Sequence, residues 1–431
     1  MSQTPPRPLN PDKRDDTGLA AFYKELTTQE RRTFWTCFTG WGLDALDFMI
    51  YPLVIGTIMT LWKVDTGIAG LAVTGTLLTS AIGGWLAGYL ADRIGRVKTL
   101  QITVAWFCIF SIACAFVQNF DQLMIARAIL GFGFGGEWAA GAVLIGETIR
   151  PQFRGRAVGV VQSAWAVGWG AAVLLQAGMF SVFPPETAWR AMFAFGVLPA
   201  LLLVYARRHV REPEIADRAR KQRAIDGDAP SLWEIFRPGT LKTTILGSVF
   251  MMGCQGGYYA ISTWIPTFLK TERHLTVINS TGYLGFLITG SFFGYLFGAW
   301  MADRFGRKKL FVSFSIAAII VVLAYTQFTI SNEAIRWLGF PLGFFSSGYL
   351  AGVGSFLSEL YPTRLRGSGQ GFCYNFGRGM GALFPALVGA FSVRFGLATA
   401  IAIFAVVAYA LLLLSAALLP ETRGIQLDDI K

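Results

Sequence analysis

The amino-acid sequence predicts an all-α membrane protein with twelve transmembrane helices, arranged in two pseudo-symmetric halves of six helices each. Its 431 residues are 54% hydrophobic and only 15% charged, whereas soluble domains carry about 25% charged residues. The chain therefore has too few charges to cover a water-facing surface. Long apolar runs follow one another along the chain, and one loop sequence occurs twice, which indicates an internal duplication.

The apolar runs give the number of helices. A spanning helix needs about 20 mostly apolar residues, and continuous apolar runs favour helices over the short alternating segments of a β-barrel. Twelve such runs are present in the sequence. We expect spans over residues 34–61, 67–90, 99–117, 121–146, 157–181, 189–207, 241–269, 279–301, 309–328, 334–358, 368–391 and 396–419.

Polar segments divide the chain and set its orientation. Lys and Arg gather in the loops after the second, fourth, eighth and tenth spans, so both termini are expected in the cytoplasm. In the linker, Ser231 can cap a short amphipathic helix over residues 232–236 on the membrane surface; a solvated spacer is an equal alternative. The expected parts are a cytoplasmic tail (1–33), a first half (34–207), a cytoplasmic linker (208–240), a second half (241–419) and a cytoplasmic tail (420–431).

The repeated loop begins at Ala91 and returns at Ala302, 211 residues later, and Glu147 and Glu359 occupy matching positions in the two halves. Glycine permits a tight turn, and a carboxylate at a helix end can meet the positive N-terminus of a helix in the other half. Such contacts would hold one conformation and break in another, although anchoring of the topology is a simpler role. The expected lock consists of Gly88, Asp92, Arg93, Gly95, Arg96, Glu147, Asp303, Arg304, Gly306, Arg307 and Glu359.

These loops resemble the signature that the major facilitator superfamily carries between its second and third and its eighth and ninth helices. The stretch from Arg127 to Gly135 resembles that superfamily's fourth-helix motif, and Pro420 to Gly424 resembles its common C-terminal ending. The second loop departs slightly, because Ala299 stands at the position of Gly88. The resemblance covers nearly the whole chain and implies the major facilitator fold. We expect a multi-pass protein of a bacterial cytoplasmic (inner) membrane.

Few charged residues lie deep inside the predicted spans, away from their ends, and each costs about 2.5–3.5 kcal/mol there. In the first half they are Asp44, Asp47, Arg127 and Glu137. Asp44 and Asp47 are three residues apart and share one helix face. Two carboxylates in a dry site cannot easily both ionise, which suits a proton carrier. We expect Asp44, Asp47 or Glu137 to carry the proton, with Arg127 as a partner that controls it; hydrogen bonds between helices are the alternative.

Arg378 is the charged residue deep inside the spans of the second half, away from their ends. A guanidinium that faces a cavity suits a carboxylate ligand through paired hydrogen bonds. We therefore expect Arg378 to bind an anion, with Asn375 on the same helix face; a tie to the first-half carboxylates is the alternative. Weaker candidates for the substrate site are Gln162, Gln255, Tyr258 and Tyr259.

Titratable carboxylates in one half and a cation in the other favour proton-coupled uptake, or symport, of a small organic anion by alternating access. The stretch from Gly42 to Phe48 resembles the Asp-Ala-x-Asp pattern of sialate/lactate-type proton symporters, and Tyr374 to Arg378 is similar to that family too. Aromatic-acid proton symporters are close relatives, but they usually have glycine where this chain has Ala45. A monocarboxylate, an aromatic acid and a sialic or sugar acid all stay open as substrates.

Two other transporter classes are alternatives. A proton-coupled sugar or polyol porter would use Gln255, Tyr258 and Tyr259 but would leave Arg378 without a role. A drug/proton antiporter typically has a Gly-Pro motif in its fifth helix, and no proline lies between Pro151 and Pro184.

Other functional classes find less support in the sequence. No nucleophile–base pair or metal-binding pattern is visible, and the five cysteines form no CxxC pair, so we expect no enzyme activity, metal or cofactor. The net charge of +11 follows from the cytoplasmic loops and linker and does not require nucleic acid. A receptor built on a transporter fold stays open. The expected partners are the lipid bilayer, protons and an organic anion, and the expected state is a monomer.

Overall fold

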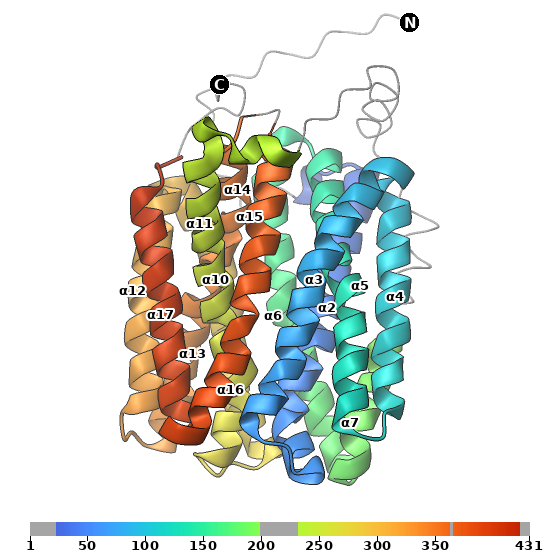
Figure 1. The fold of residues 1–431 in the computed structure, drawn as a ribbon, viewed down its shortest axis with the longest axis vertical. Coiled ribbons are helices and arrows are strands. Elements are labelled where there is room, and N and C mark those ends of the chain that lie inside the picture. Colours follow the sequence, from blue (N-terminus) through green and yellow to red (C-terminus); the bar gives the residue numbers. More distant parts are fainter. Residues whose placement is uncertain (1–22, 199–231, 363–364, 423–431) are drawn as a thin grey trace, which may run out of the picture.

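The computed structural model describes residues 23–198, 232–362 and 365–422. Figure 1 shows long helices standing side by side in one bundle, with α2 to α7 on one side and α10 to α17 on the other. The first half contains α2 (Thr28–Trp62), α3 (Thr66–Ile94), α4 (Arg96–Phe116), α5 (Phe120–Thr148), α6 (Pro151–Val182), α7 (Pro185–Ala194) and the 3₁₀ turn η1 (Phe195–Val197).

The described end of the predicted linker forms the 3₁₀ helix η2 (Leu232–Phe236), so of the two alternatives the helix is present; Ser231 lies outside the described residues. The tenth and the eleventh predicted spans are each divided into two helices. The helices that follow are α10 (Pro238–Thr271), α11 (Val277–Phe305), α12 (Arg307–Gln327), α13 (Asn332–Gly348), α14 (Leu350–Glu359), α15 (Arg366–Gly381), α16 (Leu383–Phe395) and α17 (Leu397–Leu418).

These helices follow the predicted spans closely. Within the described residues, nine helical segments are long and apolar enough to cross a membrane. Two further helices, α5 and α10, have 29 and 34 residues and lie in the same bundle. The sixth predicted span is described only as far as Leu198.

Local chemistry sets where several helices begin. A short polar side chain just before a helix accepts a hydrogen bond from one of the first free backbone N–H groups. At the start of α2, Thr27 and Glu30 bond each other's backbone reciprocally, as in a capping box. The caps of α3, α5, α11 and α13 are Asp65, Asn119, Thr276 and Ser331.

Breaks in the tenth and eleventh predicted spans separate α13 from α14 at Tyr349 and α15 from α16 at Ala382. Pro385 explains the second break, because proline lacks the N–H that would bond the carbonyl four residues earlier and its ring crowds that carbonyl. The first break follows Ser346, Ser347 and Gly348, a type of sequence at which helices bend.

The backbone confirms the internal duplication. Lys63, directly after α2, and His274, three residues after the end of α10, are 211 residues apart and both have φ of 53°. Gly95 and Gly306, also 211 residues apart, have φ of 105° and 106° in the repeated loop, a conformation that favours glycine. The same turns therefore join corresponding helices in both halves, as expected for parallel repeats.

Helix packing repeats in the same register. A methyl group on Gly83 of α3 would lie 2.1 Å from the Phe132 carbonyl oxygen of α5, and one on Gly294 of α11 would lie 2.4 Å from that of Phe344 in α13. Only glycine allows such close backbone approach. Gly83 thus allows α3 to pack tightly against α5, and Gly294 allows α11 to pack against α13 in the same way.

The two halves meet at the end of the bundle that holds the α2–α3 and α10–α11 turns, which we call the outer end. There Thr66 of α3 donates to the Gly389 carbonyl (3.0 Å) and lies 2.8 Å from the Ser392 hydroxyl of α16. Deeper in the bundle, Thr74 donates to the Ala382 carbonyl (2.6 Å). We call the opposite end, with the Gly95 and Gly306 turns, the inner end.

Candidate functional site

Charged side chains are buried near the middle of the bundle, between the two halves. They come from α2, α5 and α15, and each is at most 3% exposed. Burial of an ionised group in a dry interior is unfavourable unless another charge or hydrogen bond compensates for it. These residues are Asp44, Asp47, Arg127, Glu137 and Arg378.

Asp47 and Arg127 form an ion pair within the first half. An Arg127 nitrogen lies 3.7 Å from Asp47 Oδ2, and both side chains are fully buried. Ser111 of α4 donates a hydrogen bond to Asp47 Oδ1. The guanidinium carbon lies 5.4 Å from the centre of the Tyr51 ring and 5.9 Å from that of Phe193. Aromatic rings and opposite charge therefore enclose Arg127 on its own half.

Asp44, Glu137 and Arg378 form a second group, which joins the two halves. The carboxyl groups of Asp44 on α2 and Glu137 on α5 contact each other directly, and both interact electrostatically with Arg378 on α15. Two carboxyls can contact each other in this way when one of them holds a proton. The arrangement thus places two adjoining carboxyl groups of one half next to a cation from the opposite half.

Aromatic side chains hold the guanidinium of Arg378. Arg378 Nη2 donates to the Tyr374 hydroxyl at 3.3 Å, and the Tyr259 hydroxyl of α10 is also within hydrogen-bonding reach. The guanidinium carbon lies 5.1 Å from the Tyr374 ring centre and 5.3 Å from that of Phe134. This planar cation between flat rings is suited to a planar carboxylate.

An aromatic cluster surrounds this charge group and spans the interface between the halves. Phe48 and Phe134 stack with their ring centres 5.1 Å apart and an interplanar angle of 10°. Phe48 also lies 6.0 Å from Tyr259 of the second half. Trp165 of α6 donates its indole N–H to the Tyr258 hydroxyl across the same interface. The full aromatic cluster comprises Trp41, Phe48, Phe134, Trp165, Tyr258 and Tyr259.

The remaining predicted substrate residues have different surroundings. Gln255 on α10 is 4% exposed and packs beside Gly381, next to the break between α15 and α16. Asn375 donates to the Gly371 carbonyl (3.0 Å) and its side chain also lies against Gly84 of the first half. Gln162 on α6 is half-buried. Their roles in binding stay predictions.

Several residues of the site were not predicted from the sequence. Trp41, Phe134 and Trp165 belong to the aromatic cluster, although none was assigned to the site. Each lies three residues from a predicted site residue, namely Asp44, Glu137 and Gln162. Because residues three apart share a helix face, this spacing was the signal that could have found them. Ser111 gave no such signal, since it lies on a different helix.

The second copy of the predicted lock forms a network at the inner end. Arg307 pairs with Asp303 (3.2 Å) and with Glu359 (3.0 Å), all within the second half. Glu421 accepts from the backbone N–H groups of Arg307 and Lys308, which are the first residues of α12. Here Asp303 is bound within its own half, and the expected contact between halves stays a prediction.

Other lock residues are less informative. Arg304 is exposed, and Gly88 has open space where a side chain would begin. The first copy of the lock is only partly described, because the side chains of Asp92, Arg93, Arg96 and Glu147 lie outside the described residues. Among the described residues, no group of three His, Cys, Asp or Glu side chains is arranged to hold a metal ion.

A bundle of two repeated helical halves that encloses opposite charges at its centre is the architecture of a secondary transporter. The sequence profile of the Major Facilitator Superfamily matches residues 36–335 and 283–427. The chain belongs to this family and is a multi-pass membrane transporter. The membership confirms the predicted fold class and transporter class.

Individual relatives cover almost the whole chain. A protein from Cupriavidus pinatubonensis, named a probable 4-methylmuconolactone transporter, is 39% identical over 96% of this chain and 95% of its own length. The cis,cis-muconate transport protein of Acinetobacter baylyi is 28% identical over 80% and 84%. The sialic acid transporter NanX of Escherichia coli is 27% identical over 91% and 95%.

A solved structure shares the fold. The proton:xylose symporter XylE, bound to 6-bromo-6-deoxy-D-glucose, superimposes with a TM-score of 0.70 and covers 93% of this chain and 98% of its own. Its sequence identity is 19%, so the likeness concerns the helical architecture alone.

Proposed function

We propose that this transporter carries a small organic acid anion into the cell together with protons, by alternating access across a bacterial inner membrane, with both termini in the cytoplasm. The observation that carries the proposal is the Asp44–Glu137–Arg378 group, in which one half supplies titratable carboxyls and the other supplies the cation. The relatives named for muconolactone, cis,cis-muconate and sialic acid support an organic acid as the substrate.

Charge balance couples the two ligands. In the empty site, Arg378 is balanced by the Asp44–Glu137 carboxyl pair, which holds one proton. A substrate carboxylate that binds Arg378 takes over the role of counter-charge. The released side-chain carboxylate then lies in a dry interior without its cation, and uptake of a second proton neutralises it. Anion and proton binding therefore favour each other.

The aromatic cluster favours a flat substrate. Phe134 lies beside the guanidinium of Arg378, and Phe48 and Trp165 pack against Phe134. Ring faces stack well on planar conjugated groups. Two of the three relatives are named for muconate-type compounds, which are unsaturated carboxylates. We propose a planar unsaturated or aromatic carboxylate, with Arg378 binding its carboxylate and the cluster its conjugated body.

Uptake into proteoliposomes tests the proposal. Purified protein should accumulate one or more of cis,cis-muconate, benzoate and N-acetylneuraminate when the outside is acidic, and accumulation should fall when a protonophore collapses the pH gradient. Replacing both carboxyls, in Asp44→Asn with Glu137→Gln, should abolish the response to pH, because neither amide can take up a proton. Arg378→Gln should reduce anion uptake at least about 30-fold, since a charged hydrogen-bonded pair contributes about 2–5 kcal/mol.

Arg378→Lys provides the matched control, because it retains the charge but not the paired hydrogen bonds; we expect partial recovery. Indifference of wild-type uptake to the pH gradient would contradict proton coupling. Uptake of xylose or arabinose that survives Arg378→Gln would instead identify a sugar porter.

A further inference from the structure

A second cation lies between the halves at the outer end, far from the central site. Lys270, in the last turn of α10, donates from Nζ to the Thr57 hydroxyl of α2 at 3.3 Å. Its Cδ packs 3.5 Å from the position of a methyl group on Gly56. The side chain is half-buried, and the described residues place no carboxylate in ion-pair contact with it.

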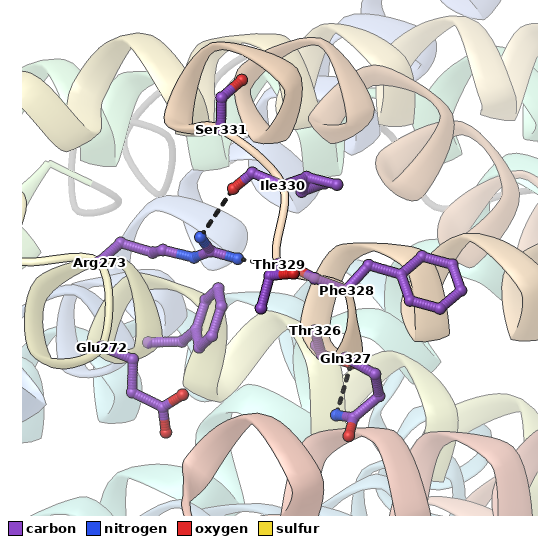
Figure 2. Close-up of a pocket in the computed structure, with 9 residues that line it drawn as sticks. Glu272, Arg273, Thr326, Gln327, Phe328, Thr329, Ile330 and Ser331 are labelled. Atoms are coloured by element: carbon purple, nitrogen blue, oxygen red, sulfur yellow. Dashed lines mark hydrogen bonds between the residues drawn. The ribbon is translucent and has the colours of Figure 1, made fainter.

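The two charged residues that follow α10 bond within the second half. Figure 2 shows the guanidinium of Arg273 directed at the 328–331 segment, where it bonds the Ile330 carbonyl at 3.0 Å. That segment and α10 line a cavity of about 470 Å³. Glu272 accepts from the Leu397 and Ala398 N–H groups at the start of α17. Of these three charged residues, Lys270 is the one that faces the first half.

Polar side chains connect Lys270 with the centre along one face of α10. Thr267, Thr263 and Tyr259 precede Lys270 at intervals of three, four and four residues, which is the spacing of a single helix face. Thr267 lies 3.7 Å from the position of a methyl group on Gly56, and Tyr259 packs on Phe48, so this face meets α2. Eleven residues correspond to about 16 Å along the helix.

The two threonine hydroxyls on this face lack hydrogen-bond partners. Thr263 and Thr267 are 0% and 2% exposed, and neither hydroxyl has a partner among the described residues. A buried hydroxyl without a partner costs about 1–3 kcal/mol. Such groups fit a surface that contacts water or a polar ligand when the outer ends of the halves separate.

We propose that Lys270 is an outer binding site for the carboxylate of the substrate, and that the face formed by Lys270, Thr267, Thr263 and Tyr259 leads the anion to Arg378. Opening of the outer end releases Lys270 from Thr57 and exposes its ammonium to solvent. The anion is held there first and then moves inward along the hydroxyl groups. This inference rests on the proposed function, because it takes the substrate to be an organic anion.

Kinetics in proteoliposomes test the outer site, with whichever of cis,cis-muconate, benzoate or N-acetylneuraminate the wild type takes up best. Lys270→Gln should raise KM about fivefold or more at low salt and leave kcat unchanged, since a single attractive charge raises the local anion concentration about tenfold. At about 0.5 M salt the difference should shrink below about twofold, because screening shortens the reach of the charge. Lys270→Arg should keep the wild-type KM.

Controls separate an anion site from a latch between the halves. Thr57→Val removes the hydrogen bond but keeps the cation, so KM should not rise. Lys63→Gln removes an exposed charge at the same end and should have a smaller effect. If Lys270→Gln does not fold, the same measurement is made with Lys270→Met, which also removes the charge. An unchanged KM in the neutral variants, or an equal rise in Thr57→Val, would overturn the outer site. Failure of the proposed function would look different, since the wild type would then take up none of these acids.

Discussion

Two groups at the centre of the bundle both combine carboxyl and guanidinium side chains, but one lies within the first half and the other joins the two halves. Asp47 and Arg127 both belong to the first half and are enclosed by Ser111, Tyr51 and Phe193. A relative movement of the two halves leaves this pair unchanged. The Asp44–Glu137–Arg378 group joins the halves, so the same movement must alter it. We therefore propose a structural role for the first group and proton and anion binding for the second.

This division predicts different effects of substitution at Arg127. Arg127→Leu leaves the Asp47 carboxylate buried without its cation, which should destabilise the fold by about 3–5 kcal/mol. Replacing both partners, in Arg127→Gln with Asp47→Asn, removes both charges and should recover most of the stability. Thermal unfolding of the purified variants measures the change. Uptake by the double variant should still respond to pH; a folded double variant without that response would assign the proton to Asp47 instead.

Sequence reasoning found all five central charges but did not assign their partners. The hydropathy pattern predicts how deep a residue lies in the bilayer, and these five residues were predicted from that depth alone. Partner choice depends on which helix faces which, and on rotations of a fraction of a turn. By depth alone, Arg127 can pair with any first-half carboxylate, and only the packing of α2 against α5 brings it to Asp47.

The tightest helix contact of the first half depends on glycines in α5. A methyl group on Gly135 would lie 1.7 Å from the Ser80 carbonyl oxygen of α3, so α3 and α5 would have to move apart. Corresponding backbone approach in the second half involves Gly343 of α13 and Leu287 of α11. These contacts make α3 with α5, and α11 with α13, rigid pairs.

Gly135→Ala should therefore lower stability by about 1–3 kcal/mol or prevent folding, because overpacking of a tight interface is unfavourable. Gly178→Ala in α6 is the matched control, since open space surrounds that position. Alanine favours a helix over glycine by up to about 1 kcal/mol, so the control should be neutral or stabilised. Size-exclusion profiles and melting temperatures of both variants give the comparison, and equal stability of the two would argue against tight packing at Gly135.

At the scale of elements, the sequence predicted the helices well and their interruptions poorly. Apolar runs and N-cap residues mark where helices lie and begin, because both effects are local. The break at Ala382 had a local cause in Pro385, but proline is tolerated inside other helices here, as at Pro52 of α2 and Pro266 of α10. Whether proline interrupts a helix depends on packing against neighbouring helices, and this packing cannot be predicted from sequence periodicity.

The whole molecule is a duplication whose two halves have diverged at the centre. Positions 211 residues after Asp44 and Asp47 are occupied by Gln255 and Tyr258, so the second half has lost the carboxylates or never had them. The turns at Gly95 and Gly306 stayed alike. Equivalent backbones suit a movement in which the halves rock against each other. In the function proposed above, the unequal centre supplies the proton-binding and anion-binding groups.

A rocking movement requires the outer contacts between α3 and α16 to open. Thr66→Cys with Ser392→Cys places two thiols where the hydroxyl oxygens are 2.8 Å apart, close enough for a disulfide after small adjustments. Oxidation of the two thiols should reduce uptake at least about 10-fold, because the cross-link holds the outer end closed. A reducing agent should restore uptake.

Ser291→Cys with Ser347→Cys forms the control, since these hydroxyls are 3.0 Å apart but both belong to the second half. Cross-linking within a half should leave uptake intact. Full uptake by the oxidised Thr66–Ser392 pair would exclude opening at this end.

The number of charges at the centre also has an electrical consequence. Three carboxylates and two guanidiniums sum to one negative charge, and the proton shared by Asp44 and Glu137 makes the empty centre neutral. A centre that holds one monovalent anion and one additional proton is neutral as well. A membrane voltage of 100 mV acts on each unit charge with about 2.3 kcal/mol, but it then does no work on either form. Accumulation of the acid would follow the pH difference alone, about tenfold for each pH unit.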